Sequence, residues 1–377
     1  MCDTLKNCNI VFFGSGDFPV PTFKSLIDYG CNITGLVTSH DKVFFNDKRL
    51  CEIAKQHNIP TYMPDSLTDE EFIKWLKDKN ADIFCVISYK FLPKELLEIP
   101  TITAFNVHAS LLPFLKGPAP IYWAIRRGFN VTGLTSFVLN NKVDDGDIIS
   151  NLEVNIDKNE TYGTLHQKLS KKCSKFTIDT IIKLLKSTDI DKILIKQPRF
   201  DINNFVYRYD TIMCAPKITS LDEECEVDSK YKYVGFGIPG FVSDYSIYYV
   251  PIEKLYRQVC SLSPHIGVRC CFHILPKETF KKEGDRNTNT KKVIIPFKIY
   301  EAELVDSHFN EPQTYIHSLV ESDGKNYLYL FSAYSKKALS VKTIQLSGKR
   351  KMDIKDFLNG FKYFKANKEE YYIKVGI

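Results

Sequence analysis

The sequence has 377 residues, a length that favours two domains over one. Its 44% hydrophobic and 25% charged residues are ordinary for a globular protein and exclude a disordered chain, a collagen and a small disulfide-rich scaffold. The net charge is only +6, and no apolar run approaches the ~18 residues that a membrane span needs. We therefore expect no membrane partner, and we see no targeting segment before Asn9.

Strand-like and helix-like patterns alternate over the first part of the chain. Short apolar runs predict strands over residues 9–13, 33–38, 61–63, 81–88, 102–107 and 132–140. Amphipathic periodicity predicts helices over residues 19–29, 50–57 and 120–127, and a further helix that begins in a capping box at Thr68-Asp69-Glu70-Glu71. The alternation is typical of an α/β fold, with a Rossmann-like, mostly parallel sheet and helices on both faces.

The pattern changes in the second part of the chain. Residues 204–250 are acidic and rich in loop signals, which indicates a linker with an insertion. Beyond them, a helix is predicted over residues 253–262 and strands over 292–304, 315–320, 326–333 and 339–346. Successive strands without long helices predict a smaller C-terminal antiparallel sheet domain, a barrel or a sandwich. We therefore expect domains at 1–203 and 251–377, joined by 204–250.

Charge is unevenly distributed along the chain. Residues 336–377 carry eleven Lys and Arg against four Asp and Glu, whereas residues 201–250 carry four against eight. A basic end suits a polyanion such as nucleic acid, although a solvated Lys-rich surface gives the same pattern.

The cysteines and histidines do not predict a metal site. The 11 cysteines form no CxxC pair, and the 8 histidines show no paired ligand spacing. Scattered thiols of this kind indicate a reducing compartment rather than a disulfide framework.

The Gly14-x-Gly16 turn lies between a predicted strand and a predicted helix, where dinucleotide-binding loops occur. Pro19 stands where the third glycine of such a loop would be, so the indication of a nicotinamide cofactor is weak. The alternative is a tight turn that brings backbone N–H groups to the start of a helix, where an anion can bind.

Asn106 and His108 lie two residues apart at the carboxyl end of a predicted strand. Alternation places both side chains on one face of that strand, at the edge where open parallel sheets bind ligands. A neutral amide beside an imidazole can stabilise an oxyanion and move a proton. A structural histidine at a strand end is the alternative interpretation.

Three carboxylates follow the next predicted strand, at Asp144, Asp145 and Asp147. Asp-Gly favours a turn, so an acidic turn is one interpretation, and a divalent metal or a general base are the others. No further acidic cluster is near in sequence to complete a metal shell, which favours a base that orients or shares the proton of an imidazole.

Two runs now show a resemblance to a known family. NVHASLLPFLKGPAPIYWAIRRG and the later TGLTSFVLNNKVDDGDII resemble the folate-dependent formyltransferases, which share an Asn-x-His-x-Ser-Leu-Leu-Pro core and a later Asp-x-Gly. The tail QLSGKRKM with DFLNG is similar to the branch of that family that acts on methionyl-tRNA. The resemblance covers most of residues 9–220 and patches of 250–360.

The resemblance implies a fold, a reaction and its partners. It implies a Rossmann-like catalytic domain, an OB-like β-barrel that binds tRNA, and transfer of formyl from 10-formyltetrahydrofolate to the α-amine of methionyl-initiator tRNA, without a metal, by a monomer. A small amine acceptor, such as an amino sugar nucleotide or glycinamide ribonucleotide, is the alternative, as is a non-catalytic folate- or RNA-binding relative. The resemblance also implies the mitochondrial matrix, with the cytoplasm as the alternative.

The resemblance also implies roles for individual residues. Asn106, His108 and Asp144 would be catalytic, with Asp145 in place of the family's threonine. The folate site would be lined by Ser110, Leu111, Leu112, Pro113, Ile87, Ser88 and Tyr89. Candidate contacts to tRNA are Lys42, Lys48, Arg49, Lys336, Lys337, Lys349, Arg350 and Lys351. The first three stand in a loop that is shorter and less basic than the loop usual in the family.

Overall fold

The structure is a computed structural model. The structure describes residues 7–39, 48–198, 252–276, 293–307, 320–331, 336–365 and 371–376. These residues form two compact units, and residues 125–128 and 158–163 group with the second. The expected boundary at residue 203, the 204–250 linker and nearly all of the predicted 315–320 strand lie outside the described residues.

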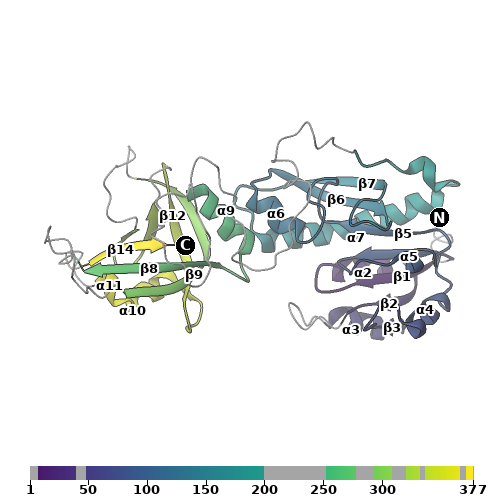
Figure 1. The fold of residues 1–377 in the computed structure, drawn as a ribbon, viewed down its shortest axis with the longest axis horizontal. Helices are drawn as coiled ribbons and strands as arrows, with labels where there is room; N and C mark the ends of the chain where they lie inside the picture. Colours follow the sequence, from purple (N-terminus) through teal and green to yellow (C-terminus); the bar gives the residue numbers. More distant parts are fainter. Residues whose placement is uncertain are drawn as a thin grey trace. The chain divides into compact units, whose positions relative to one another are not determined.

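The first unit is built on a seven-stranded sheet (Figure 1). Its strands are β1 (Asn9–Gly14), β2 (Asn32–Val37), β3 (Thr61–Tyr62), β4 (Ile83–Ile87), β5 (Thr103–His108), β6 (Val131–Val138) and β7 (Ile148–Asn155), in the order β3-β2-β1-β4-β5-β6-β7. The strands from β3 to β5 pair in parallel, whereas β6 pairs antiparallel with both β5 and β7. This doubly wound arrangement confirms the mostly parallel sheet that the sequence predicted.

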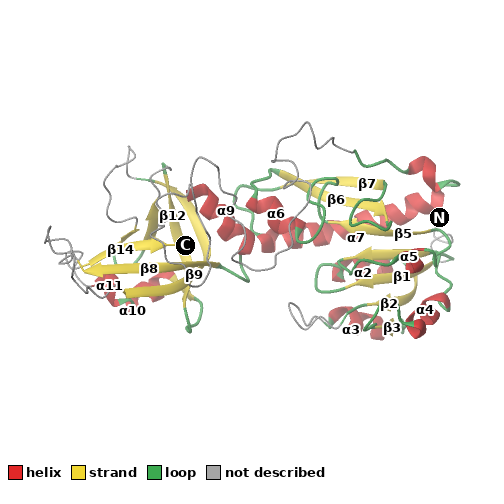
Figure 2. Cartoon of the chain, viewed as in Figure 1, coloured by secondary structure: helices red, strands yellow, loops and turns green. Residues whose placement is uncertain are grey.

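Helices cover both faces of this sheet, as predicted (Figure 2). They are α2 (Val20–Asp28), α3 (Arg49–Gln56), α4 (Glu70–Lys77), α5 (Lys94–Leu97), α6 (Pro120–Arg126) and α7 (Tyr162–Lys186), followed by the 3₁₀ helix η1 (Ile190–Ile193). Consecutive residues of β1 show how the faces divide, because side chains alternate along a strand. Phe13 joins the core cluster that includes Phe72 of α4, and the Phe12 ring lies 5.0 Å from that of Phe23 in α2.

The start of α4 differs from the prediction. The capping box placed the N-cap at Thr68, but Asp69 takes that position with extended backbone, and its carboxylate accepts a hydrogen bond from the Glu71 N–H. The Thr68 N–H is instead bonded to the Ser66 hydroxyl at 3.2 Å. A capping carboxylate one residue later therefore begins the helix, since Asp caps at least as well as Thr.

The second unit is an antiparallel sheet with short helices. Its strands are β8 (Val268–Pro276), β9 (Val293–Asp306), β10 (Val320–Ser322), β11 (Leu328–Phe331), β12 (Lys337–Leu346), β13 (Met352–Asp353) and β14 (Tyr371–Gly376). Its helices are α9 (Ile252–Leu262), α10 (Ile354–Gly360) and α11 (Lys362–Lys365). The strand order is β10-β11-β12-β9-β8-β14, and β13 pairs with β12.

The two ends of that strand order, β10 and β14, also come near each other, so the sheet curls toward a closed barrel. Its core contains the fully buried Phe272, whose ring stacks on that of Phe297 at 4.0 Å. The C-terminal sheet domain that the sequence predicted is therefore confirmed. Of the helices in the described ranges, none is both long and apolar enough to cross a membrane.

Candidate active site

Strand β5 presents Asn106 and His108 at its carboxyl end. Its register pairs Val86 of β4 with Asn106, and Thr135 of β6 with His108. The His108 side chain is 8% exposed, and Asn106 is half-buried. The Oδ1 atom of Asn106 is buried and has no hydrogen-bond partner among the described residues. A buried amide oxygen without a partner costs roughly 1–3 kcal/mol, and this oxygen can accept a hydrogen bond from a bound group.

The two ring nitrogens of His108 have different partners. Nε2 lies 2.8 Å from the carbonyl oxygen of Leu115, and because a carbonyl can only accept, Nε2 carries the hydrogen and donates it. Nδ1 lies 3.5 Å from Oδ2 of Asp144, whose side chain is 13% exposed. The ring is therefore held between a carbonyl and a carboxylate from two separate loops.

The neighbouring carboxylates Asp144 and Asp145 have separate partners. Asp144 faces His108, and its Oδ2 also accepts a hydrogen bond from the Gly117 N–H at 2.8 Å. Asp145 instead forms an ion pair with Lys116. Asp144 has a φ of +48°, in the left-handed region that Asp tolerates better than most residues. The structure thus brings Asp144 to the imidazole, and Asp145 to a lysine.

The Ser110–Pro113 segment forms a tight loop between β5 and the His108 partner Leu115. The Ser110 hydroxyl donates to the Phe114 carbonyl at 2.6 Å, and Thr135 Oγ1 donates to the Ser110 carbonyl at 2.7 Å. Leu112 packs in the core with Phe137 and Ile148. Of this segment, Ser110 and Leu111 line a cavity of about 400 Å³; its remaining lining residues are Phe114, Leu115, Phe129, Asn130, Val131 and Thr132.

The second set of expected folate contacts follows β4. The Ile87 side chain is fully buried, and Ser88 has a φ of +52° with its carbonyl accepting the Ser15 N–H at 3.0 Å. The Tyr89 ring lies edge-on to Phe13 at 5.6 Å. These residues therefore stand where the carboxyl ends of β4 and β1 adjoin.

The glycine turn after β1 leads to a second carboxylate–imidazole pair. Asp17 Oδ1 lies 3.4 Å from Nε2 of His166 on α7. The hydrogen bond from His166 is the largest cause that lowers the pKa of Asp17 below its usual range. No cluster of three or more His, Cys, Asp or Glu side chains is placed to hold a metal ion in the described part of the chain.

Sequence reasoning missed Gln197. Its Nε2 donates to the backbone carbonyls of Asp144 at 2.9 Å and Gly146 at 2.8 Å, so it fastens the loop that carries the catalytic candidate. No local sequence signal connects Gln197 to a loop 51 residues earlier.

Two family models match the chain. The Formyl transferase model matches residues 8–181, and the Formyl transferase C-terminal domain model matches residues 250–362. The chain belongs to the formyltransferase family.

Relatives match this formyltransferase over nearly its whole length. A methionyl-tRNA formyltransferase of Azobacteroides pseudotrichonymphae is 29% identical over 96% of this chain and 98% of its own. One of Parabacteroides distasonis is 28% identical over 95% of this chain and 97% of its own. An N-formyltransferase structure from Helicobacter canadensis, with folinic acid and dTDP-3-aminofucose, gives a TM-score of 0.54 at 13% identity over 90% of this chain and 99% of that one. At that identity it shows the fold alone.

The basic residues predicted for the formyltransferase's second unit fall into two groups. Lys336 and Lys337 stand at the start of β12, and Lys349, Arg350 and Lys351 follow its end. A ten-residue strand spans about 30 Å, so the two groups do not form one surface patch. In the first unit, Lys48 and Arg49 stand at the start of α3, while Lys42 lies outside the described residues.

Two cations that sequence reasoning missed extend the second of these groups. Arg269 on β8 pairs in register with Lys298 on β9, and Lys298 pairs with Gln345 on β12. The Gln345 amide in turn donates to the Lys349 carbonyl at 2.7 Å. Residues in register share a face of the sheet, so Arg269 and Lys298 lie beside Gln345, which is bonded to the turn that follows β12. We call Arg269 and Lys298 together with the cations after β12 the basic row: Arg269, Lys298, Lys349, Arg350 and Lys351.

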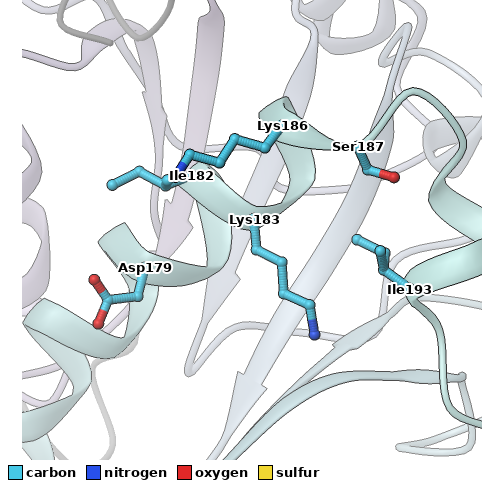
Figure 3. Close-up of a pocket in the computed structure, with 6 residues that line it drawn as sticks. All are labelled: Asp179, Ile182, Lys183, Lys186, Ser187 and Ile193. Carbon is cyan, nitrogen blue, oxygen red and sulfur yellow. The ribbon is translucent and has the colours of Figure 1, made fainter.

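A second cavity of the formyltransferase's first unit lies along α7 and has a volume of about 420 Å³ (Figure 3). Asp179, Ile182, Lys183 and Lys186 contribute to its lining. The Lys183 ammonium already donates to the carbonyl of Ile149 in β7. None of its lining residues belongs to the His108 site, and it contains no orphaned polar atom of the kind seen at Asn106.

Proposed function

We propose that this formyltransferase transfers a formyl group from 10-formyltetrahydrofolate to the α-amine of methionyl-initiator tRNA, for translation initiation. The observation that carries the proposal is the buried His108–Asp144 pair at the carboxyl edge of the sheet, on the same strand face as Asn106, whose buried amide oxygen has no partner in the described fold. The choice of acceptor is supported by the relatives named above, which match both units and are methionyl-tRNA formyltransferases. That match is why we favour this acceptor over small amines.

The chemistry of the acceptor determines what the site has to supply. An α-amine has a pKa of about 7.7–8.0, so a usable fraction is already neutral at pH 7. The larger task is to stabilise negative charge on the formyl oxygen as the amine attacks. The Nδ2–H of the Asn106 amide is the group that can donate to this oxygen, and one such donor is worth ~10²–10³ in rate. Its Oδ1 is buried and has no partner in the described fold, so it can accept a hydrogen bond from the attacking amine.

The hydrogen bonds of His108 differ from those that the sequence suggested. The sequence suggested that its ring donates to the formyl oxygen, but the Nε2–H is already bonded to Leu115. When Nδ1 also carries a proton, the ring is a cation held against the Asp144 carboxylate, and its charge can stabilise a nearby oxyanion without a direct bond. Because both ring nitrogens of His108 already have partners, the Asp144 carboxylate is the group that can accept the proton released by the amine.

The Asn106 amide also shows whether the site is suited to the formyl donor. The buried Oδ1 of Asn106 has no partner in the described fold and suits a bound group that brings an N–H, whereas the formyl oxygen is an acceptor and would face the Nδ2–H of the same amide. When bound, the folate supplies the activated formyl group. The Ser110–Pro113 and Ile87–Tyr89 segments adjoin the carboxyl ends of β5 and β4, and they remain the proposed folate contacts.

For the tRNA partner we propose the basic row of the second unit. Lys349 and Arg350 are exposed in the turn after β12 and can reach phosphates. Lys351 is partly engaged, because its ammonium stacks 4.3 Å from the Tyr300 ring centroid and donates to the Pro264 carbonyl at 3.2 Å.

The compartment and the assembly state are also proposals. The relatives that match are bacterial, which favours the cytoplasm over the mitochondrial matrix that the resemblance had suggested. We propose that the protein acts as a monomer, and gel filtration with light scattering tests this directly.

Formylation of defined acceptors tests the proposed function. Purified protein is incubated with 10-formyltetrahydrofolate and radiolabelled methionyl-initiator tRNA, methionyl-elongator tRNA, glycinamide ribonucleotide or a dTDP-amino sugar. We expect turnover of the initiator tRNA at a kcat/KM at least ~10²-fold above that for the small amines. A higher kcat/KM for an amino sugar or for glycinamide ribonucleotide would identify that compound as the acceptor in place of the tRNA. No turnover of any acceptor would refute the proposal that the protein is an enzyme.

A further inference from the structure

The chain returns to the Asp144 loop just after η1. The backbone of Ile195 exchanges two hydrogen bonds with Ile148, with N–O distances of 2.7 and 2.8 Å. Two residues later, the Gln197 side chain donates to the carbonyls of Asp144 and Gly146. Gln197 is 9% exposed, so these bonds form in a buried setting. One side chain thus satisfies two carbonyls of the loop that carries the proposed catalytic carboxylate.

The loop needs this support because its backbone conformation is restricted. Asp144 has positive φ, which costs a non-glycine residue of order 1–3 kcal/mol unless its surroundings impose it. Gly146 lies so close to β6 that an added Cβ would be 1.6 Å from the Val138 carbonyl oxygen. The loop is therefore fixed on one side by β6 and on the other by Gln197.

The second polar atom of Gln197 indicates what the residue is for. Its Oε1 is buried and has no hydrogen-bond partner among the described residues. A side chain kept only to fill space would be replaced by an apolar one of the same size without that cost of about 1–3 kcal/mol. The two hydrogen bonds donated by Nε2, and the loop geometry that they impose, offset the cost of burying Oε1 without a partner.

We propose that Gln197 is a positioning residue for formyl transfer: it holds the Asp144–Gly146 loop so that the Asp144 carboxylate stays against Nδ1 of His108. It acts through Asp144 and does not contact the substrates. The inference rests on the proposed function for the reaction that it serves, but the geometry that it claims can be measured without any acceptor.

Gln197→Glu provides the first test, because it keeps the size of the side chain and removes the donor. We expect kcat to fall by about 10–100-fold, on the scale that a ~1 Å misplacement costs, with KM for methionyl-initiator tRNA changed by less than about 2-fold. Gln167→Glu is the matched control, since Gln167 is an exposed glutamine of α7 and the charge change is the same. Wild-type kcat in Gln197→Glu would overturn the proposal.

The double variant separates positioning from general structural support. If Gln197 acts through Asp144, then Gln197→Glu should cost less than about 3-fold in kcat when added to Asp144→Asn. A full multiplicative loss in that background would show a merely structural role and would overturn the proposal.

A readout without substrates distinguishes failure of this inference from failure of the proposed function. In ¹⁵N-histidine-labelled protein at one pH, we expect Gln197→Glu to move the His108 ring resonances toward those of Asp144→Asn, and Gln167→Glu to leave them in place. If Gln197→Glu does not fold, Gln197→Met removes the donor without adding charge and should give the same shift. Unchanged His108 resonances in a folded Gln197 variant would overturn the inference whichever acceptor the enzyme uses.

Discussion

The two units hold their polar side chains in different ways. At the His108 site the side chains are largely buried, and His108, Asp144 and Gln197 each have at least one bond or close contact that fixes their orientation. In the basic row, Lys349 and Arg350 are exposed in a turn. Charge development on one reacting carbon requires fixed groups, whereas binding a chain of phosphates requires mainly charge density. The difference implies that substitutions in the first unit alter kcat and those in the second alter affinity.

The largest expected effect comes from neutralising one of two adjacent carboxylates, Asp144, with the neutralisation of Asp145 as its comparison. Asp144→Asn should lower kcat by ~10²-fold or more, because it removes the charge that faces His108. Asp145→Asn removes an equal charge one residue away, which pairs with Lys116, and should cost less than ~10-fold. Steady-state formylation of methionyl-tRNA measures both. Equal losses would show that the loop, rather than the Asp144 contact, sets the rate.

The next effect concerns the second unit. Replacing Lys349 and Arg350 by Gln should weaken tRNA binding and reduce the slope of log affinity against log salt by about one per lost phosphate contact, with kcat unchanged. Lys336→Gln is the matched control at the other end of β12. Fluorescence anisotropy with labelled tRNA at several salt concentrations gives both slopes. If Lys336→Gln weakens tRNA binding as much as the replacement of Lys349 and Arg350, the tRNA-binding surface includes both groups of basic residues that the sequence suggested.

The smallest effect sharpens the statement that charges in the first unit are fixed. His166 lowers the pKa of Asp17, so the pair stabilises the folded state above the ordinary carboxyl pKa, and that contribution disappears as the pH falls through the lowered folded-state pKa. His166→Ala should therefore lower the melting temperature near pH 6, and the difference from wild type should shrink below about pH 4.

His57→Ala, at an exposed histidine that ends α3, is the control for the Asp17 pair and should show no such pH dependence. Differential scanning fluorimetry across pH measures both variants. A His166→Ala difference that grows on acidification would contradict the direction assigned to Asp17.

Local patterns predicted much of the first unit. Strand alternation alone placed Asn106 and His108 on one face, and apolar runs located the parallel strands within a residue or two. The antiparallel pairing of β6 could not be read, because the α6 crossover before it is also compatible with a parallel strand. β7 was missed because polar residues such as Asn151 and Glu153 interrupt its apolar run.

Contacts between distant segments were much harder to predict. The approach of Asp144 to His108 followed from the family resemblance and not from spacing, and the Gln197 bonds to the Asp144 loop had no sequence signal at all. The basic residues of the second unit are visible in the sequence as candidate tRNA contacts, but only the structure shows that β12 separates them and that Arg269 pairs in register with Lys298.

The most direct test of the account is single-turnover formylation of methionyl-initiator tRNA by the wild type and by Asn106→Ala, with both proteins saturated by 10-formyltetrahydrofolate. The account predicts rapid transfer by the wild type and a rate constant at least ~10²-fold lower in the variant, with the same tRNA affinity. A variant that transfers formyl at close to the wild-type rate would contradict the claim that the Asn106 amide stabilises the reacting formyl group.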